Sequence, residues 1–148
     1  MIADSSWQAI DSAEWYENEA EVGSSVSAYL KTHGGKREDV WFTTKLKTNS
    51  SYDVTRKAIK KSIQRSGLGY LDLYLLHSPY GGKEKRLECW KAVEDAIDEG
   101  EVRVGGVSNY GVKHVSFCSI DLVESWEVAV MSYHSMVSAL WTELFSVI

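Results

Sequence analysis

Cysteine and proline are scarce in this chain of 148 residues, which contains two cysteines and one proline. The cysteines, Cys89 and Cys118, are too few for a disulfide framework and do not form a CxxC pair that could hold zinc. We therefore expect both thiols to be reduced and to lie in the core.

Long apolar runs and an excess of basic residues are also absent. No stretch approaches the roughly 18 apolar residues of a membrane-spanning helix, and residues 1–6 lack the segments of a signal peptide. The chain has 16 basic and 21 acidic residues, and no basic stripe that could neutralise nucleic-acid phosphates. We expect a globular, cytoplasmic protein that neither enters a membrane nor binds nucleic acid. With 44% hydrophobic residues it can bury a core.

Short apolar runs alternate with amphipathic helical patterns along most of the sequence. The runs lie at residues 7–11, 40–44, 70–76 and 102–107, and the first helix is expected at about 17–31. Ser50 and Asp53 have the spacing of a capping box before the second helix, and Gly100 ends the third. A fourth helix is expected from about Gly111. Beyond Ser119 the pattern is lost, apart from an apolar helical face through Met136 and every fourth residue after it.

The strand ends recur at nearly constant intervals. They fall at Asp11, Lys45, His77 and Ser108, which are 34, 32 and 31 residues apart. Alternating strands and helices predict an α/β fold with a parallel sheet. Repeats of this size fit either an open doubly wound sheet or a (β/α)₈ barrel, which needs about 250 residues. We expect a single domain of four to five βα units, which in the second case is a partial barrel.

Each predicted strand ends in a polar side chain, and in parallel α/β folds the chemistry collects at that edge of the sheet. Asp11, Lys45 and His77 end the first three strands, and Tyr16 lies just after the first. An ammonium group beside a phenol favours the phenolate and so makes the phenol a better proton donor, while a carboxylate keeps the ammonium charged. A neutral histidine can donate a hydrogen bond to a carbonyl oxygen. The four side chains therefore indicate a proton donor suited to carbonyl chemistry.

Four segments together resemble the aldo-keto reductase family, in order and at the family's spacing. The resemblance covers about residues 7–115, whereas 116–148 diverge, and it implies the second to fifth units of a (β/α)₈ barrel that binds NADPH. The segments are Ile10-Asp11-Ser12-Ala13-Glu14-Trp15-Tyr16-Glu17-Asn18-Glu19, Phe42-Thr43-Thr44-Lys45, Tyr70-Leu71-Asp72-Leu73-Tyr74-Leu75-Leu76-His77-Ser78-Pro79 and Gly106-Val107-Ser108-Asn109-Tyr110.

The resemblance implies NADPH-dependent reduction of an aldehyde or ketone, in which Tyr16 protonates the carbonyl oxygen while the nicotinamide delivers hydride. It also implies that Ser108 and Asn109 bind the nicotinamide carboxamide. The roles that it implies for the site residues are catalytic for Asp11, Tyr16, Lys45 and His77, cofactor-binding for Ser108, Asn109 and Asp11, and substrate-binding for Trp15, Tyr16 and His77.

Two other functions fit the sequence. The chain could be a non-catalytic barrel fragment that associates with itself or with a full-length relative, because an open half-barrel exposes strand edges. Alternatively, Lys45 could form a Schiff base with a carbonyl substrate, although a carboxylate partner opposes this because a nucleophilic amine must be neutral. An open half-barrel that lacks the family's first and last units is expected to have little activity by itself.

Overall fold

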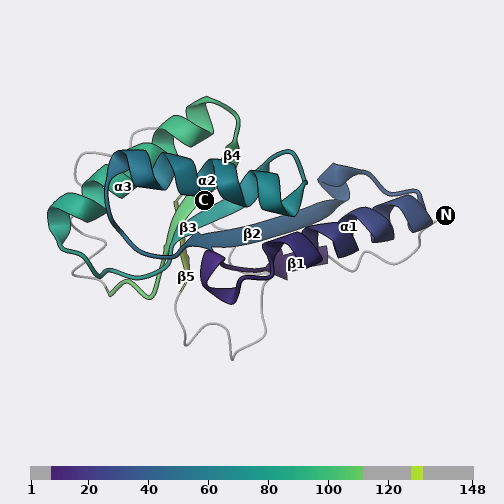
Figure 1. Ribbon diagram of the computed structural model, residues 1–148, viewed down its shortest axis with the longest axis horizontal. Helices are drawn as coiled ribbons and strands as arrows, with labels where there is room; N and C mark the ends of the chain where they lie inside the picture. The colour runs from purple at the N-terminus through teal and green to yellow at the C-terminus, as the bar shows by residue number, and fades with distance from the viewer. Residues whose placement is uncertain (1–7, 112–127, 132–148) are drawn as a thin grey trace.

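The computed structural model describes residues 8–111 and 128–131 as a parallel sheet with helices in the connections (Figure 1). These residues form an α/β unit, as the sequence predicted. In chain order the elements are β1 (Gln8–Asp11), the 3₁₀ turn η1 (Glu14–Tyr16), α1 (Glu19–His33), the 3₁₀ turn η2 (Arg37–Asp39), β2 (Val40–Leu46), α2 (Tyr52–Ser66), β3 (Leu71–Leu76), α3 (Lys83–Asp98), β4 (Val102–Ser108) and β5 (Val128–Met131).

The five strands lie in the order β1-β2-β3-β4-β5, and every neighbouring pair is parallel. A doubly wound sheet reverses its strand order at one point, whereas a barrel adds each strand beside the last. Among the described strands there is no reversal. The helices α1, α2 and α3 also pack side by side in sequence order. The described residues therefore have the arrangement of consecutive barrel units.

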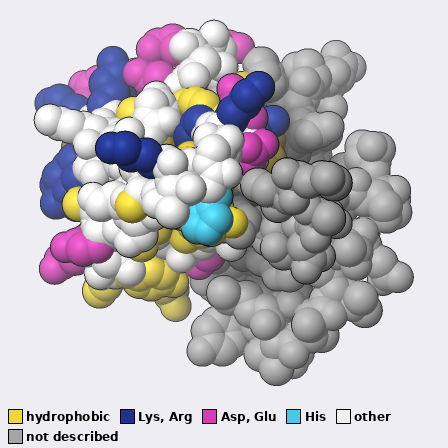
Figure 2. Space-filling model, turned by 90° about the vertical axis from the view of Figure 1, so that its right-hand side faces the viewer, with side chains coloured by type: hydrophobic (Ala, Val, Ile, Leu, Met, Phe, Trp, Pro, Cys, Tyr) yellow, Lys and Arg dark blue, Asp and Glu magenta, His cyan; other side chains and the backbone are white. Residues whose placement is uncertain are grey.

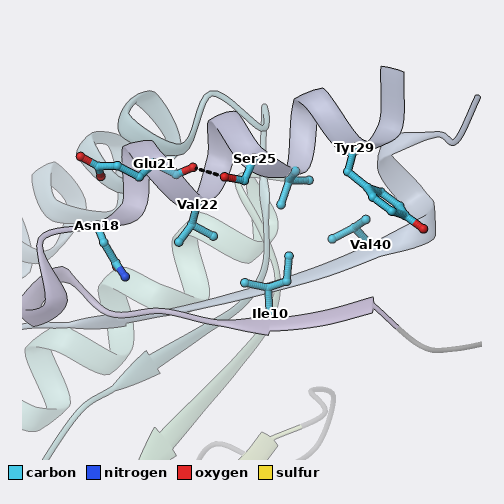
Figure 3. Close-up of a pocket in the computed structure, with 8 residues that line it drawn as sticks. Ile10, Asn18, Glu21, Val22, Ser25, Tyr29 and Val40 are labelled. Atoms are coloured by element: carbon cyan, nitrogen blue, oxygen red, sulfur yellow. Dashed lines mark hydrogen bonds between the residues drawn. The ribbon is translucent and has the colours of Figure 1, made fainter. Parts of the chain in front are cut away.

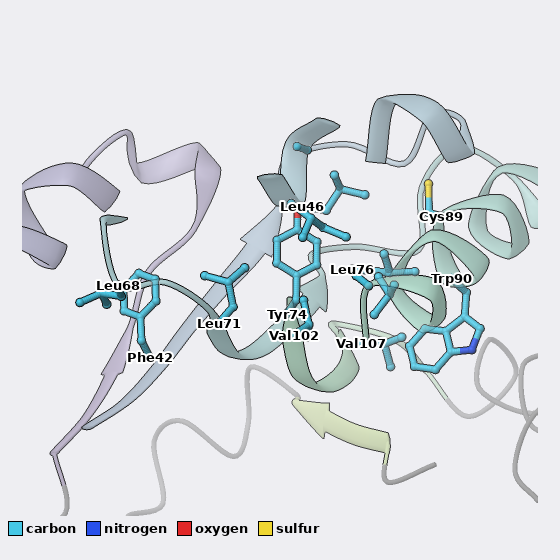
Figure 4. Packing of buried hydrophobic residues seen from close by; sticks show 14 of the residues in the cluster. Phe42, Leu46, Leu68, Leu71, Tyr74, Leu76, Cys89, Trp90, Val102 and Val107 are labelled. Carbon is cyan, nitrogen blue, oxygen red and sulfur yellow. The ribbon is translucent and has the colours of Figure 1, made fainter. Parts of the chain in front are cut away.

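The core lies between the sheet and the layer of helices (Figure 4). Phe42, Tyr74 and Trp90 are among its largest buried side chains. Within the helix layer, α1 and α2 approach closely at Gly23, where a Cβ atom would overlap the backbone carbonyl of Ser66 in α2. Cys89 is a free, buried cysteine, as predicted, whereas Cys118 lies outside the described residues.

Local geometry corrects three predicted boundaries. Glu17 has a positive φ of 54°, which prevents a helix from passing through it, so α1 begins at Glu19 and not at residue 17. Ser51, and not Ser50, caps α2, and its side chain accepts a hydrogen bond from the Val54 amide. Lys45 is the penultimate residue of β2 and does not end the strand.

The strand β5 was not predicted. Its four residues, Val128–Met131, continue the sheet beside β4, in a part of the sequence where no strand was expected. The expected fourth helix and the apolar helical face near the end of the sequence fall outside the described residues.

The surface of the described residues carries charges of both signs, which are interspersed on the face shown in Figure 2. Among the described helices, none is long and apolar enough to cross a membrane.

Candidate active site

The four proposed catalytic side chains come from three consecutive units of the sheet. Asp11 ends β1, Tyr16 ends the short turn η1, Lys45 lies near the end of β2, and His77 directly follows β3. Because the strands are parallel and in register, these positions lie at the same edge of the sheet. The structure therefore brings the four residues together, as the sequence predicted.

Lys45 and Asp11 form a partly buried ion pair. The Lys45 Nζ atom donates to both Asp11 carboxylate oxygens, at 2.7 and 2.6 Å, and to the backbone oxygen of Ser12 at 2.9 Å. The Lys45 side chain is only 3% exposed, whereas that of Asp11 is 24% exposed. All three ammonium hydrogens have an acceptor, so the donors of the buried lysine are satisfied.

Tyr16 lies next to Lys45 on the solvent side of the cluster. The Lys45 Nζ atom is 5.2 Å from the centroid of the Tyr16 ring. The ring also meets the His77 imidazole edge to face, with 6.1 Å between the centroids. Tyr16 is 49% exposed, so a small molecule can reach it from solvent.

His77 is half-buried beside the same lysine. Burial lowers its pKa below the ordinary value of 6.5, and the Lys45 ammonium group lowers it further, while Asp11 opposes the shift. The imidazole is therefore neutral at neutral pH and has one N–H to donate. Its Nδ1 atom is buried and has no hydrogen-bond partner among the residues that the structure describes.

Ser108 and Asn109 follow on the next strand, where the resemblance implied a binding site for nicotinamide. Ser108 is the last residue of β4 and is buried. Asn109 has a positive φ of 61°, and its Nδ2 atom donates to the His77 backbone oxygen at 3.1 Å and to Ser108 Oγ at 3.0 Å. These bonds use both amide hydrogens of Asn109 and leave its Oδ1 atom to accept a hydrogen bond.

Trp15 lies at the rim of the site and is 58% exposed. Its Nε1 atom donates to the backbone oxygen of Lys47 at 2.8 Å, and the Lys47 ammonium lies 5.0 Å from the ring centroid. The indole is therefore held in place by the loop after β2, with much of its surface available for contact.

One residue of the site region was missed in the sequence. Asn49, in the loop after β2, is only 5% exposed, and its Nδ2 atom donates to the backbone oxygens of Ser78 and Tyr80. Its place four residues after Lys45 puts it at the carboxyl edge of the sheet. However, an amide there has no catalytic signature, so only the structure shows what it contacts.

A groove of about 480 Å³ lies elsewhere, on the helix side of the sheet between α1 and the ends of β1 and β2 (Figure 3). None of the predicted site residues line it. Its lining residues are Ile10, Asn18, Glu21, Val22, Ser25, Val26, Tyr29 and Val40.

Comparison with known proteins gives one family. The model of the Aldo/keto reductase family matches residues 1–144, which extends on both sides of the segment in which the motifs were found. An uncharacterized oxidoreductase of Schizosaccharomyces pombe is 48% identical over 109 residues, which are 74% of this chain and 38% of the relative. Glyoxal reductase of Bacillus subtilis is 39% identical over 110 residues, again 74% of this chain and 38% of the relative.

Solved structures agree with the sequence relatives. The chain resembles a Bombyx mori aldo-keto reductase in complex with NADP, with a TM-score of 0.74 and 28% identity over 85% of this chain and 44% of the other. It also resembles an aldo-keto reductase from a deep-sea metagenome, with a TM-score of 0.72 and 34% identity over 85% of this chain and 45% of the other. The fold is therefore part of a (β/α)₈ barrel and not an open doubly wound sheet. The chain spans less than half the length of these relatives.

Proposed function

We propose that this chain, which belongs to the aldo/keto reductase family, reduces an aldehyde or ketone with NADPH and uses Tyr16 as the general acid. The observation that carries the proposal is the cluster at the carboxyl edge of the sheet. There, an accessible phenol lies over a buried, charged lysine and beside a half-buried histidine.

Tyr16 is the group placed to give a proton to a substrate. Its hydroxyl proton passes to the carbonyl oxygen as that oxygen gains negative charge, and this leaves a phenolate. The Lys45 ammonium, 5.2 Å from the ring centroid, stabilises that phenolate, and the phenolate then recovers a proton from solvent. Asp11 holds the Lys45 ammonium group in place by accepting two of its three hydrogen bonds.

His77 has a different task. Its lowered pKa keeps the imidazole neutral, so that it can donate one hydrogen bond to the carbonyl oxygen without competing as an acid. This hydrogen bond orients the substrate toward Tyr16. Trp15, exposed at the rim, offers an apolar surface to the remainder of the substrate.

The residues at the end of β4 fit the nicotinamide end of the cofactor. When bound, NADPH supplies the hydride that the carbonyl carbon accepts. Asn109 Oδ1 can accept from the carboxamide N–H₂ and the Ser108 hydroxyl can donate to its oxygen. Asp11, the third residue assigned to the cofactor, ends β1 at the same edge of the sheet, with β2 and β3 between it and Ser108. The Bombyx mori relative in complex with NADP supports the choice of a nicotinamide cofactor and of its phosphorylated form.

The Schiff-base alternative for Lys45 is not favoured by the geometry. A nucleophilic amine needs a free lone pair, whereas this ammonium group donates to three oxygens and is buried. Hydride transfer uses the lysine as a cation, which is the state that its contacts stabilise.

The test of the proposal is a comparison of Tyr16→Phe with Tyr80→Phe. Tyr80 is 78% exposed in the loop after β3 and serves as the matched control. We expect the unaltered chain and Tyr80→Phe to bind NADPH and to consume it with a panel of aldehydes and ketones, at a low rate because the chain spans less than half of its relatives. Tyr16→Phe should bind NADPH but lose at least about a hundredfold in turnover, the low end of what a general acid contributes. Equal turnover in both variants would refute the role of Tyr16.

A second candidate function is association through the strand edges without catalysis. The chain spans less than half of its relatives, and β1 and β5 form the two edges of the described sheet. Such edges can pair with a second copy or with a full-length relative. Light scattering across a range of concentrations tests this, because a constant monomer mass would exclude self-association and a mass that rises without NADPH binding would favour it.

A further inference from the structure

Three loops at the carboxyl edge of the sheet meet at one buried amide. The side chain of Asn49, from the loop after β2, donates to Ser78 O at 2.7 Å and to Tyr80 O at 2.8 Å, both in the loop after β3. The same Nδ2 atom lies 3.5 Å from the hydroxyl of Tyr110, in the loop after β4. Both amide hydrogens are thus directed at the loop that begins with His77.

The backbone at His77 is held from two sides. Asn49 binds the carbonyl of Ser78, and Asn109 binds the carbonyl of His77 itself at 3.1 Å. Within the described part of the chain, the imidazole Nδ1 atom is buried without a hydrogen-bond partner, and the ring meets only the edge-to-face contact with Tyr16 that the structure gives for it. A catalytic histidine commonly has its second nitrogen fixed by a neighbouring group. Here the position of the ring depends on the position of its backbone.

We propose that Asn49 is a positioning residue that fixes the His77 imidazole, and with it the Ser108–Asn109 turn, by holding the loop after β3 through two carbonyl groups. The proposal rests on the proposed function only in assigning His77 and Ser108–Asn109 to the reaction. The placement of the loops is a property of the chain by itself.

The chemistry of the contact requires an amide. One nitrogen with two hydrogens can serve two carbonyl oxygens at once, whereas a hydroxyl has one hydrogen and a carboxylate has none. The loops after β2 and β3 also pack closely at this point, since a Cβ atom on Gly81 would come within 3.1 Å of the Asn49 backbone oxygen. Because Asn49 is 5% exposed, water cannot readily replace the lost donors.

The first test measures amide hydrogen exchange in Asn49→Ala and in a matched control, Thr48→Ala, which alters the exposed neighbouring residue. Asn49→Ala should speed exchange about tenfold in peptides that cover 78–82 and 108–111, while exchange in α2 stays unchanged. Thr48→Ala should change neither. Uniformly faster exchange across α2 and both loops in Asn49→Ala would overturn the proposal, since it would mark a general loss of stability.

The second test follows the His77 imidazole by NMR as the pH is varied, with the signal assigned from His77→Gln. The groups that face His77 are Lys45, Asp11 and the Tyr16 ring, and burial beside Lys45 lowers its pKa. If Asn49→Ala releases the loop, the titration midpoint should move up toward that of an exposed histidine. An unchanged midpoint would overturn the proposal, because a residue that only stabilises the fold would not move it.

Neither measurement needs cofactor or substrate, so failure of the proposed function and failure of this inference are distinguishable. If Asn49→Ala does not fold, Asn49→Ser retains one donor and is expected to show the same changes at smaller amplitude. If the unaltered chain turns over, Asn49→Ala should lower kcat about tenfold through misplacement of His77. If Asn49→Ala speeds exchange in the loop after β3 but leaves kcat unchanged, the proposed role of Asn49 in positioning His77 for catalysis would be overturned.

Discussion

Replacing Asp11 by asparagine should destabilise the protein more than removing its lysine partner does. The Lys45 side chain is 3% exposed and directs three donors at Asp11 and Ser12, so its charge has almost no access to water. Breaking a buried ion pair by removing one partner costs about 3–5 kcal/mol. In Asp11→Asn one amide oxygen still accepts a bond and the side chain is partly open to solvent, so we expect a loss of about 2 kcal/mol.

The reverse variant, Lys45→Met, leaves a different group unpaired. The Asp11 carboxylate is 24% exposed and can be hydrated, while methionine occupies much of the space of the lysine stem. We therefore expect a loss of about 1 kcal/mol or less. The double variant Asp11→Asn/Lys45→Met should resemble Lys45→Met, because no buried charge remains.

Urea unfolding of the whole chain, followed by circular dichroism, measures these differences. Lys91→Met is the control, because Lys91 pairs with Asp95 on the surface, is 60% exposed, and should leave stability almost unchanged. A Lys45→Met variant that is less stable than Asp11→Asn would refute the reasoning. It would show that an unpaired Asp11 carboxylate costs more stability than an unpaired Lys45 ammonium group.

Three further changes should have separate effects. Gly23→Ala should cost about 3 kcal/mol in urea unfolding, because the added Cβ overlaps the backbone of Ser66, which cannot move without shifting α2. Ser51→Ala should cost about 1 kcal/mol in the same assay and Ser50→Ala much less, since Ser51 alone caps α2. Because the pKa of His77 is lowered in the folded state, the unfolded chain binds more protons, so stability should fall as pH drops below about 6.5. His77→Gln should flatten that part of a curve of unfolding free energy against pH.

Much of the fold was predictable because its signal is local. A buried parallel strand is a short apolar run and its helix has a 3.6-residue period, so four strands and three helices could be located from the sequence. The errors arose where one backbone angle or one hydrogen bond decides a boundary, as at Glu17 and Ser51. β5 was missed because a four-residue strand gives little signal, and its pairing with β4 is a contact distant in sequence.

The candidate site also contains some residues that could be predicted from the sequence and one that could not. Asp11, Lys45 and His77 could be predicted because each lies at the end of a recognisable strand, and parallel strands bring their ends together. Asn49 could not, since its importance comes from two carbonyl groups about thirty residues further along the chain. In the sequence, Asn49 cannot be distinguished from a loop residue that is exposed to solvent. Its contacts exist only in the folded chain, where the loops after β2 and β3 meet.

Lys45 and His77 are therefore held in place by different contacts, and this difference predicts which property of the site each substitution changes. Lys45 is fixed through its charged end, so a neutral partner disturbs its electrostatics while the backbone stays in place. His77 is fixed through its backbone, so loss of an amide donor moves the ring without changing any charge. Asp11 variants should thus alter the proton donor, whereas Asn49 variants should alter the orientation of the substrate. Since all these contacts lie within β1 to β4 and their loops, the partial barrel contains the parts needed to hold both.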